Sequence, residues 1–174
     1  MSAAASTRRS ATRSCYLPGR KSMSLPKSGY YAVQASTPRK WLKVQSDGKL
    51  AATEDTQQTA SPLLLEPLDV SAVHPTFALK FHAPGASGRG VWLSRVLIGS
   101  NNYIVAVKEE IDPFCHFAYY EIDGNLCGVA ADTGLFWHVD SNDRSTVKPD
   151  ASSYQTDKSC HFSLFALPDQ PDRS

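Results

Sequence analysis

Short runs of apolar residues, separated by polar turns, fill the chain from about residue 29 to residue 168. Val, Ile, Leu, Tyr, Phe and Trp dominate each run, and Gly, Asn, Asp or Pro ends it. Such runs are typical of β-strands. No long stretch shows the 3.6-residue period of an amphipathic helix. The pattern therefore predicts an all-β domain.

The same order of strands recurs along the chain. A Cys-His-Phe triplet at residues 115–117 returns at residues 160–162, which is 45 positions later (160 − 115). A period in this range indicates a fold built from repeats. We assign repeats to about residues 29–68, 76–122 and 123–167, and we expect four strands in each.

One alignment inside the repeats has to be chosen. We align Gly134 with Gly90, which places Phe136 opposite Trp92 and Trp137 opposite Leu93. Aligning the two tryptophans instead would leave Gly134 without a counterpart. Because a tight turn before a strand often needs a positive φ, which glycine adopts without cost, the glycine alignment is favoured.

A four-stranded unit of this length has one apolar face and open edges, so it cannot fold alone. Propellers need four or more such units, whereas three units can close a six-stranded barrel capped by three hairpins, the β-trefoil. Six residues are predicted to meet near the threefold axis, where truncation to Ala would cost about 3–5 kcal/mol. They are Trp41, Trp92, Phe136, Leu65, Phe117 and Phe162.

Three motifs in repeat two resemble the fascin-type β-trefoil repeat. They are Gly-Val-Trp-Leu-Ser-Arg at 90–95, Val-Ala-Val at 105–107 and Pro-Phe-Cys-His-Phe at 113–117. The resemblance covers about residues 29–168, and repeat one has Leu64 or Leu65 in place of the closing phenylalanine. It implies a non-enzymatic protein that docks on cytoskeletal filaments, actin or microtubules, or inside a large assembly.

The charge is distributed unevenly. Residues 1–28 carry six basic residues and no acidic one, whereas residues 29–174 carry 12 basic and all 17 acidic residues. The Ser, Ala, Thr and Arg content predicts a disordered or extended arm. We expect its basic side chains to lie on an acidic partner, such as actin or tubulin. They are Arg8, Arg9, Arg13, Arg20, Lys21 and Lys27.

Other interpretations of the arm are a solvated leader and an organelle transit peptide, since it is rich in Arg and Ser. No secretory signal is visible, and no apolar run approaches the roughly 20 residues that span a bilayer. The four cysteines lack Cys-x-x-Cys spacing, which favours a reducing compartment. We expect a cytoplasmic, cytoskeleton-associated protein, or an organelle protein if the arm is a transit peptide. Residues 169–174 form a polar tail.

Catalytic and metal sites are not predicted. The two Cys-His pairs suggest zinc, but threefold-related strands would separate the two histidines, so we expect packed cysteines, surface histidines, and neither metal nor cofactor. His74, His82 and His138 lack triad spacing, and the glycine-rich segment 85–90 lacks the lysine of a phosphate loop. An acidic turn at 109–112 is expected to be solvated. We expect neither an enzyme nor a nucleic-acid-binding protein.

Repeat two contains an insertion. Leu79 and Trp92 are 13 positions apart, whereas Val33 and Trp41 are 8 apart. The extra residues lie in segment 82–90, a surface loop that is either neutral or a binding loop, with Ser87 and Arg89 as candidate contacts. The alternative function is a sugar-binding trefoil lectin, although the Gln-x-Trp triplet of ricin-type lectins is absent.

Overall fold

The computed structural model describes residues 25–85, 88–123 and 125–168. The strands of repeat one are β1 (Gly29–Ala35), β2 (Lys40–Val44), β3 (Leu50–Glu54) and β4 (Leu63–Asp69). Those of repeat two are β5 (Thr76–Phe81), β6 (Val91–Ile98), β7 (Asn101–Lys108) and β8 (Phe117–Asp123). Those of repeat three are β9 (Leu126–Ala130), β10 (Phe136–Val139), β11 (Val147–Ala151) and β12 (Phe162–Ala166).

A short 3-10 helix precedes the last strand of each repeat: η1 (Gln57–Thr59), η2 (Pro113–Cys115) and η3 (Lys158–Cys160). In η2 and η3 an aspartate side chain accepts a hydrogen bond from a backbone amide of the helix and so caps it. Among the described residues, no helix has the length and apolar content to cross a bilayer.

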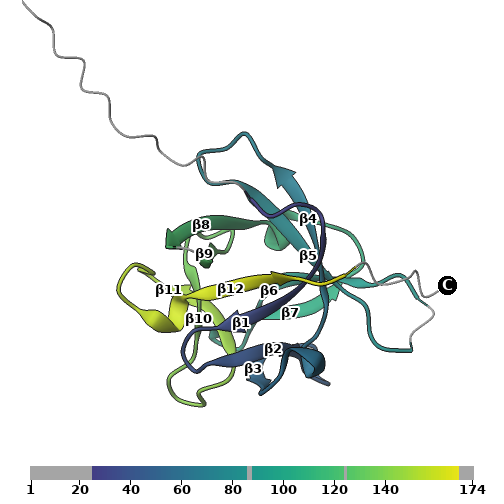
Figure 1. Cartoon of the computed structure of the whole chain (residues 1–174), viewed down its shortest axis with the longest axis horizontal. Helices are drawn as coiled ribbons and strands as arrows, with labels where there is room; N and C mark the ends of the chain where they lie inside the picture. The colour runs from purple at the N-terminus through teal and green to yellow at the C-terminus, as the bar shows by residue number, and fades with distance from the viewer. Residues whose placement is uncertain (1–24, 86–87, 124, 169–174) are drawn as a thin grey trace, which may run out of the picture.

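Six antiparallel strands close a barrel. β1 pairs with β4 and β12, β5 with β4 and β8, and β9 with β8 and β12, so the ring of strands returns to its start. The hairpins β2–β3, β6–β7 and β10–β11 follow the first strand of each repeat. Figure 1 shows the β4–β5 turn at the end of the molecule away from β2–β3. This is a β-trefoil, and the predicted fold class is confirmed.

The aromatic residue that opens each hairpin lies outside the barrel, and the next residue lies inside. In all three hairpins the strand register shifts by one residue between these two positions. The second residues, Leu42, Leu93 and Trp137, are fully buried in the main core. Trp92 belongs to a separate small cluster. The prediction that Trp41, Trp92 and Phe136 meet at the axis is therefore wrong by one position.

The glycine alignment is confirmed, because the register shift falls after Trp92 and after Phe136. The two glycines have different reasons for being there. Gly134 has a φ of +80°, as expected. A Cβ on Gly90 would lie 2.6 Å from the carbonyl oxygen of Phe81, so there the chain needs glycine for a close approach.

The closing strands also differ from the prediction in repeat one. Leu63 takes the position of Phe117 and Phe162, so the prediction of Leu64 or Leu65 is wrong. Leu63 and Leu65 are both fully buried, because residues two apart on a strand share a face. The matching partners on neighbouring strands are Tyr31–Leu63, Phe77–Phe117 and Cys127–Phe162.

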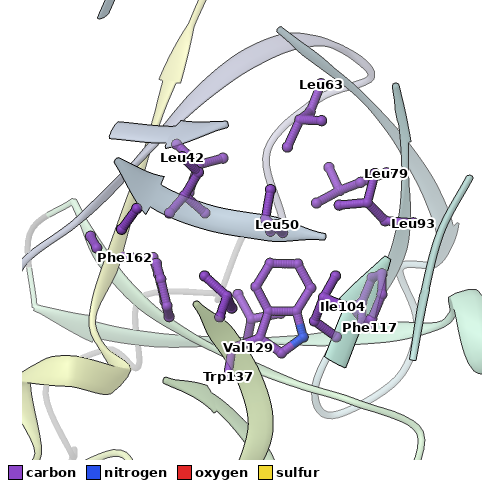
Figure 2. Packing of buried hydrophobic residues seen from close by; sticks show 14 of the residues in the cluster. Leu42, Leu50, Leu63, Leu79, Leu93, Ile104, Phe117, Val129, Trp137 and Phe162 are labelled. Atoms are coloured by element: carbon purple, nitrogen blue, oxygen red, sulfur yellow. The ribbon is translucent and has the colours of Figure 1, made fainter. Parts of the chain in front are cut away.

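The indole of Trp137 lies in the middle of the core (Figure 2). Its ring centre is 4.8 Å from that of Phe117 and 6.2 Å from that of Phe162, with near-perpendicular planes. Such edge-to-face contacts add to the stabilisation from burial. Leu42 and Leu93 fill the matching positions in the other repeats.

Candidate binding surfaces

Most of the predicted arm residues lie outside the described part of the chain, namely Arg8, Arg9, Arg13, Arg20 and Lys21. Lys27 is described and exposed. Leu25 packs against the core, and the Tyr31 hydroxyl donates a hydrogen bond to the Lys27 carbonyl at 3.0 Å. Of the disordered or extended arm that we expected over residues 1–28, the structure describes residues 25–28, and Leu25 and Lys27 contact the barrel.

Three of the four residues in the two Cys-His pairs are buried. Cys115 and Cys160 are fully buried, and burial raises the pKa of the Cys160 thiol to about 11. His116 is exposed as predicted, but His161 is buried, and its Nε2–H donates a hydrogen bond to the Tyr154 carbonyl oxygen at 2.6 Å. The prediction of a surface position is wrong for His161, because the segment before η3 folds over it. No group of described residues could hold a metal ion.

The predicted acidic turn contains one structural carboxylate. Asp112 forms an ion pair with Lys108 and accepts a hydrogen bond from the Phe114 amide at 3.0 Å. The bond from Lys108 is the main reason that the pKa of Asp112 is lowered. Glu109 and Glu110 are exposed. Asp112 therefore fixes the start of η2, and with it the position of Phe114.

The insertion of repeat two forms one wall of a pocket of about 450 Å³, which we call the insertion pocket. The opposite wall is the turn after β2 in repeat one. Ser87 lies outside the described residues, whereas Arg89 is exposed and lines the pocket. The apolar contributions come from Val44, Phe81, Ala83, Val91 and Ala106.

A second, polar pocket of about 350 Å³ lies on the other side of the same turn, between repeats one and three. It is lined mainly by Gln45, Ser46, Asp47, Lys49, Thr53, Ser145 and Thr146. Its described lining holds no aromatic side chain. The Asp47 carboxylate already pairs with Lys49 and accepts a hydrogen bond from the Lys49 amide.

A third feature is a departure from threefold symmetry at Arg95. The hairpin registers pair Val44 with Leu50, Arg95 with Ile104, and Val139 with Val147, so these three residues are equivalent. Val44 and Val139 are buried in the core. Repeat two therefore has an arginine where the other repeats have a buried valine.

The Arg95 guanidinium is held in place by acceptors from two elements. Its Nε and Nη2 donate to the two carboxylate oxygens of Asp132 at 2.6 and 2.8 Å, and Nη1 donates to Asn102 Oδ1 at 3.0 Å. The hydrogen bond to Asp132 raises the pKa of Arg95. A bidentate pair of this kind fixes the plane of the guanidinium as well as neutralising its charge.

Apolar side chains lie next to this fixed guanidinium. The Arg95 Cζ is 5.1 Å from the centre of the Phe114 ring, and Lys108 Nζ is 5.9 Å from it. Phe114 is 43% exposed and Leu97 is 62% exposed. Leu97 pairs with Asn102, on the face of the hairpin that carries Arg95. We call Arg95, Leu97, Lys108, Phe114 and Asp132 the Arg95–Phe114 surface.

The hairpin that carries this surface is longer than its counterparts. β6 and β7 each have 8 residues, whereas β2 and β3 each have 5. Gly99, with a φ of +64°, begins the two-residue turn that joins β6 to β7. The extra length exposes Leu97 and also Ile98, which is 46% exposed.

Sequence reasoning missed this surface. Arg95 belongs to the 90–95 motif and Phe114 to the 113–117 motif, and both motifs indicate the trefoil repeat without indicating a binding role for either residue. A signal was present: once the repeats are aligned on Gly90 and Gly134, Arg95 falls opposite Val139.

The comparisons with known proteins bear on the fold alone. No protein-family model matches the chain, and no curated protein matches it. The crystal structure of a designed threefold symmetric protein, ThreeFoil, is similar, with a TM-score of 0.62 at 15% identity over 80% of this chain and 99% of that one. At this identity the likeness supports the trefoil fold but not kinship with fascins in particular.

Proposed function

We propose that this protein is a non-enzymatic docking module that attaches to a cytoskeletal filament or another large protein assembly. The observation that carries the proposal is the Arg95–Phe114 surface. Protein interfaces are enriched in arginine and aromatic residues, and hot spots at their centres often include both. Here an arginine occupies the position of a core valine and is braced by Asp132, next to exposed Phe114 and Leu97.

The basic arm has a separate role in this proposal. Arg95 and Lys108 are already paired with Asp132 and Asp112, so the surface offers a partner apolar contact more than charge. The arm, which has six basic residues and no acidic residue of its own, instead supplies positive charge to an acidic partner, such as actin or tubulin. The two contributions should respond differently to salt, because screening weakens attraction between exposed charges but not apolar contact.

Co-sedimentation with actin filaments and with microtubules tests the proposal. We expect the full chain to pellet with one of the two, and the double variant Leu97→Ser and Phe114→Ser to bind at least tenfold more weakly. The matched control is Val70→Ser and Val73→Ser, because these residues are 69% and 85% exposed on the β4–β5 turn. Equal loss in both double variants would contradict the proposal, and no pelleting with either filament would exclude actin and microtubules as its partners.

Deleting residues 1–24 tests the arm and leaves Leu25 on the core. We expect the truncated chain to keep its fold, to bind several-fold more weakly at low salt, and to show little further loss when the salt concentration is raised. If the truncated chain binds as well as the full chain, the role given to the arm is wrong.

The second candidate is sugar binding, which the polar pocket between repeats one and three favours through its amide, hydroxyl and carboxylate groups. It is less well supported, because sugar sites usually add an exposed aromatic ring to such groups, and Lys49 already engages Asp47. A glycan array with the full chain tests this function. A bound glycan whose binding is lost in Gln45→Ala would favour sugar binding, and the absence of any bound glycan would exclude it.

A further inference from the structure

The insertion pocket offers a binding site of a different kind from the Arg95–Phe114 surface. Its volume of about 450 Å³ falls within the range of small-molecule sites, roughly 300–1,000 Å³. Its lining includes Ala83, Gly88, Arg89 and Gly90, which belong to the longer connection between β5 and β6. In the other repeats the corresponding connections are short: residues 36–39 after β1 and residues 131–135 after β9.

The described walls of the pocket are held by backbone contacts from two repeats. In repeat one, the Gln45 amide donates to the Lys49 carbonyl at 2.8 Å, and the Ala106 amide of β7 donates to the Gly48 carbonyl at 2.9 Å. In repeat two, Phe81 pairs with Val91 at the base of the insertion. Gly90 packs so closely on Phe81 that a Cβ there would collide with it. The base of the pocket is therefore largely formed before any ligand binds.

The chemistry of the lining is asymmetric. Val44, Phe81, Val91 and Ala106 supply an apolar floor. Arg89 is the one ionisable side chain among the described residues that line the pocket, and it is exposed at the rim. Asp47 lies in the chain between the lining residues Ser46 and Gly48, and its carboxylate is paired with Lys49. A ligand with an apolar body would bury that body on the floor, and a negative group on it would face Arg89.

We propose that the insertion pocket binds an organic anion, an aromatic or branched aliphatic group that carries a carboxylate, sulfonate or phosphate. Arg89 explains why the ligand carries a negative charge, and the apolar floor explains why the rest of the ligand is apolar. The inference goes beyond the proposed docking function, because the two sites share no residue, so either can fail while the other holds.

The test uses 8-anilinonaphthalene-1-sulfonate, a fluorescent aromatic anion, titrated into the native full chain. N-phenyl-1-naphthylamine has a similar aromatic body without the sulfonate and serves as the uncharged probe. We expect one saturable site for the anion and at least fivefold weaker binding of the amine. Arg89→Gln should weaken binding of the anion at least fivefold and leave the amine unchanged. The matched control, Arg144→Gln, alters an exposed arginine outside the pocket lining and should change neither.

A second variant blocks the space itself. A Cβ on Gly88 would meet no described atom within 4 Å, so the side chain of Gly88→Trp has room to enter the pocket that Gly88 lines. We expect it to abolish saturable binding of both probes with an unchanged circular dichroism spectrum. Binding that survives Arg89→Gln and Gly88→Trp, but is lost in Leu97→Ser, would place the probe on the exposed hairpin and overturn the proposal.

Discussion

Val44 and Arg95 occupy the same position in repeats one and two, yet they do different things. Val44 fills the core, whereas Arg95 turns outward to Asp132 and lies against Phe114. The barrel stays closed in both places, so the fold does not need an apolar residue at all three equivalent positions. Positions that depart from the pattern of a fold are often functional sites, so we infer a functional role for Arg95.

The largest difference in stability is expected between substitutions of two phenylalanines that lie three residues apart. Phe117 is fully buried and equivalent to Leu63 and Phe162, whereas Phe114 is 43% exposed. Phe117→Ala should lower the free energy of unfolding by about 3–5 kcal/mol, and Phe114→Ala by less than about 1 kcal/mol. Urea unfolding of the two variants measures this difference. Equal losses would mean that Phe114 serves the fold and not recognition.

Two glycines at the insertion provide the next comparison. A Cβ on Gly90 would lie 2.6 Å from the Phe81 carbonyl oxygen, whereas one on Gly88 would lie in open space. Gly90→Ala should cost about 1–3 kcal/mol through overpacking, and Gly88→Ala should cost nothing or stabilise slightly. Thermal unfolding of both variants checks this. If Gly90→Ala is as stable as wild type, the base of the insertion is not clamped as described.

A smaller effect is expected from the ion pair of repeat three, Lys148 with Asp140. The hydrogen bond from Lys148 is the main cause of the lowered pKa of Asp140. A carboxyl with a lowered folded pKa contributes stability above its unfolded value of about 3.9, and loses it as the pH falls through the folded pKa. Asp140→Asn should therefore cost about 1 kcal/mol at pH 7 and progressively less below about pH 4.

Urea unfolding at pH 7 and at pH 3 measures this dependence. The matched substitution Asp132→Asn removes the charged partner of Arg95 and should cost less at pH 7, because the Asp132 side chain is 20% exposed and that of Asp140 is 9% exposed. A larger loss from Asp132→Asn than from Asp140→Asn would mean that the Arg95 pair serves the fold more than the Lys148 pair does.

Most of the fold could be predicted from the sequence. The recurrent Cys-His-Phe triplet and the glycine alignment lead to three repeats, and three repeats lead to a closed barrel. The errors were small shifts along strands. Leu63, Leu64 and Leu65 are chemically alike, so spacing does not choose among them. The one-residue register shift after each hairpin aromatic moves the core position from Trp41 to Leu42, and a pattern of apolar residues does not reveal such a shift.

The binding surfaces could be predicted only in part. The insertion was visible from the spacing, and the structure places Arg89 in the lining of a pocket, while its role in binding stays a prediction. In the sequence, Arg95 resembles any polar residue of a strand. Its unusual position becomes visible only from the threefold alignment and from its partner Asp132, which is 37 residues away in sequence. The length of the β6–β7 hairpin depends on where the turn at Gly99 falls, and the alternation of residues does not fix that point alone.

The most direct test restores the threefold residue. In Arg95→Val with Asp132→Ala, both members of the pair are removed, so neither charge is left without its partner. We predict a free energy of unfolding within about 1 kcal/mol of wild type, since replacing such a pair with apolar residues is often neutral or stabilising. We also predict at least tenfold weaker co-sedimentation with the filament that the wild-type chain binds. A free energy of unfolding that falls by several kcal/mol, together with unchanged co-sedimentation, would contradict the account.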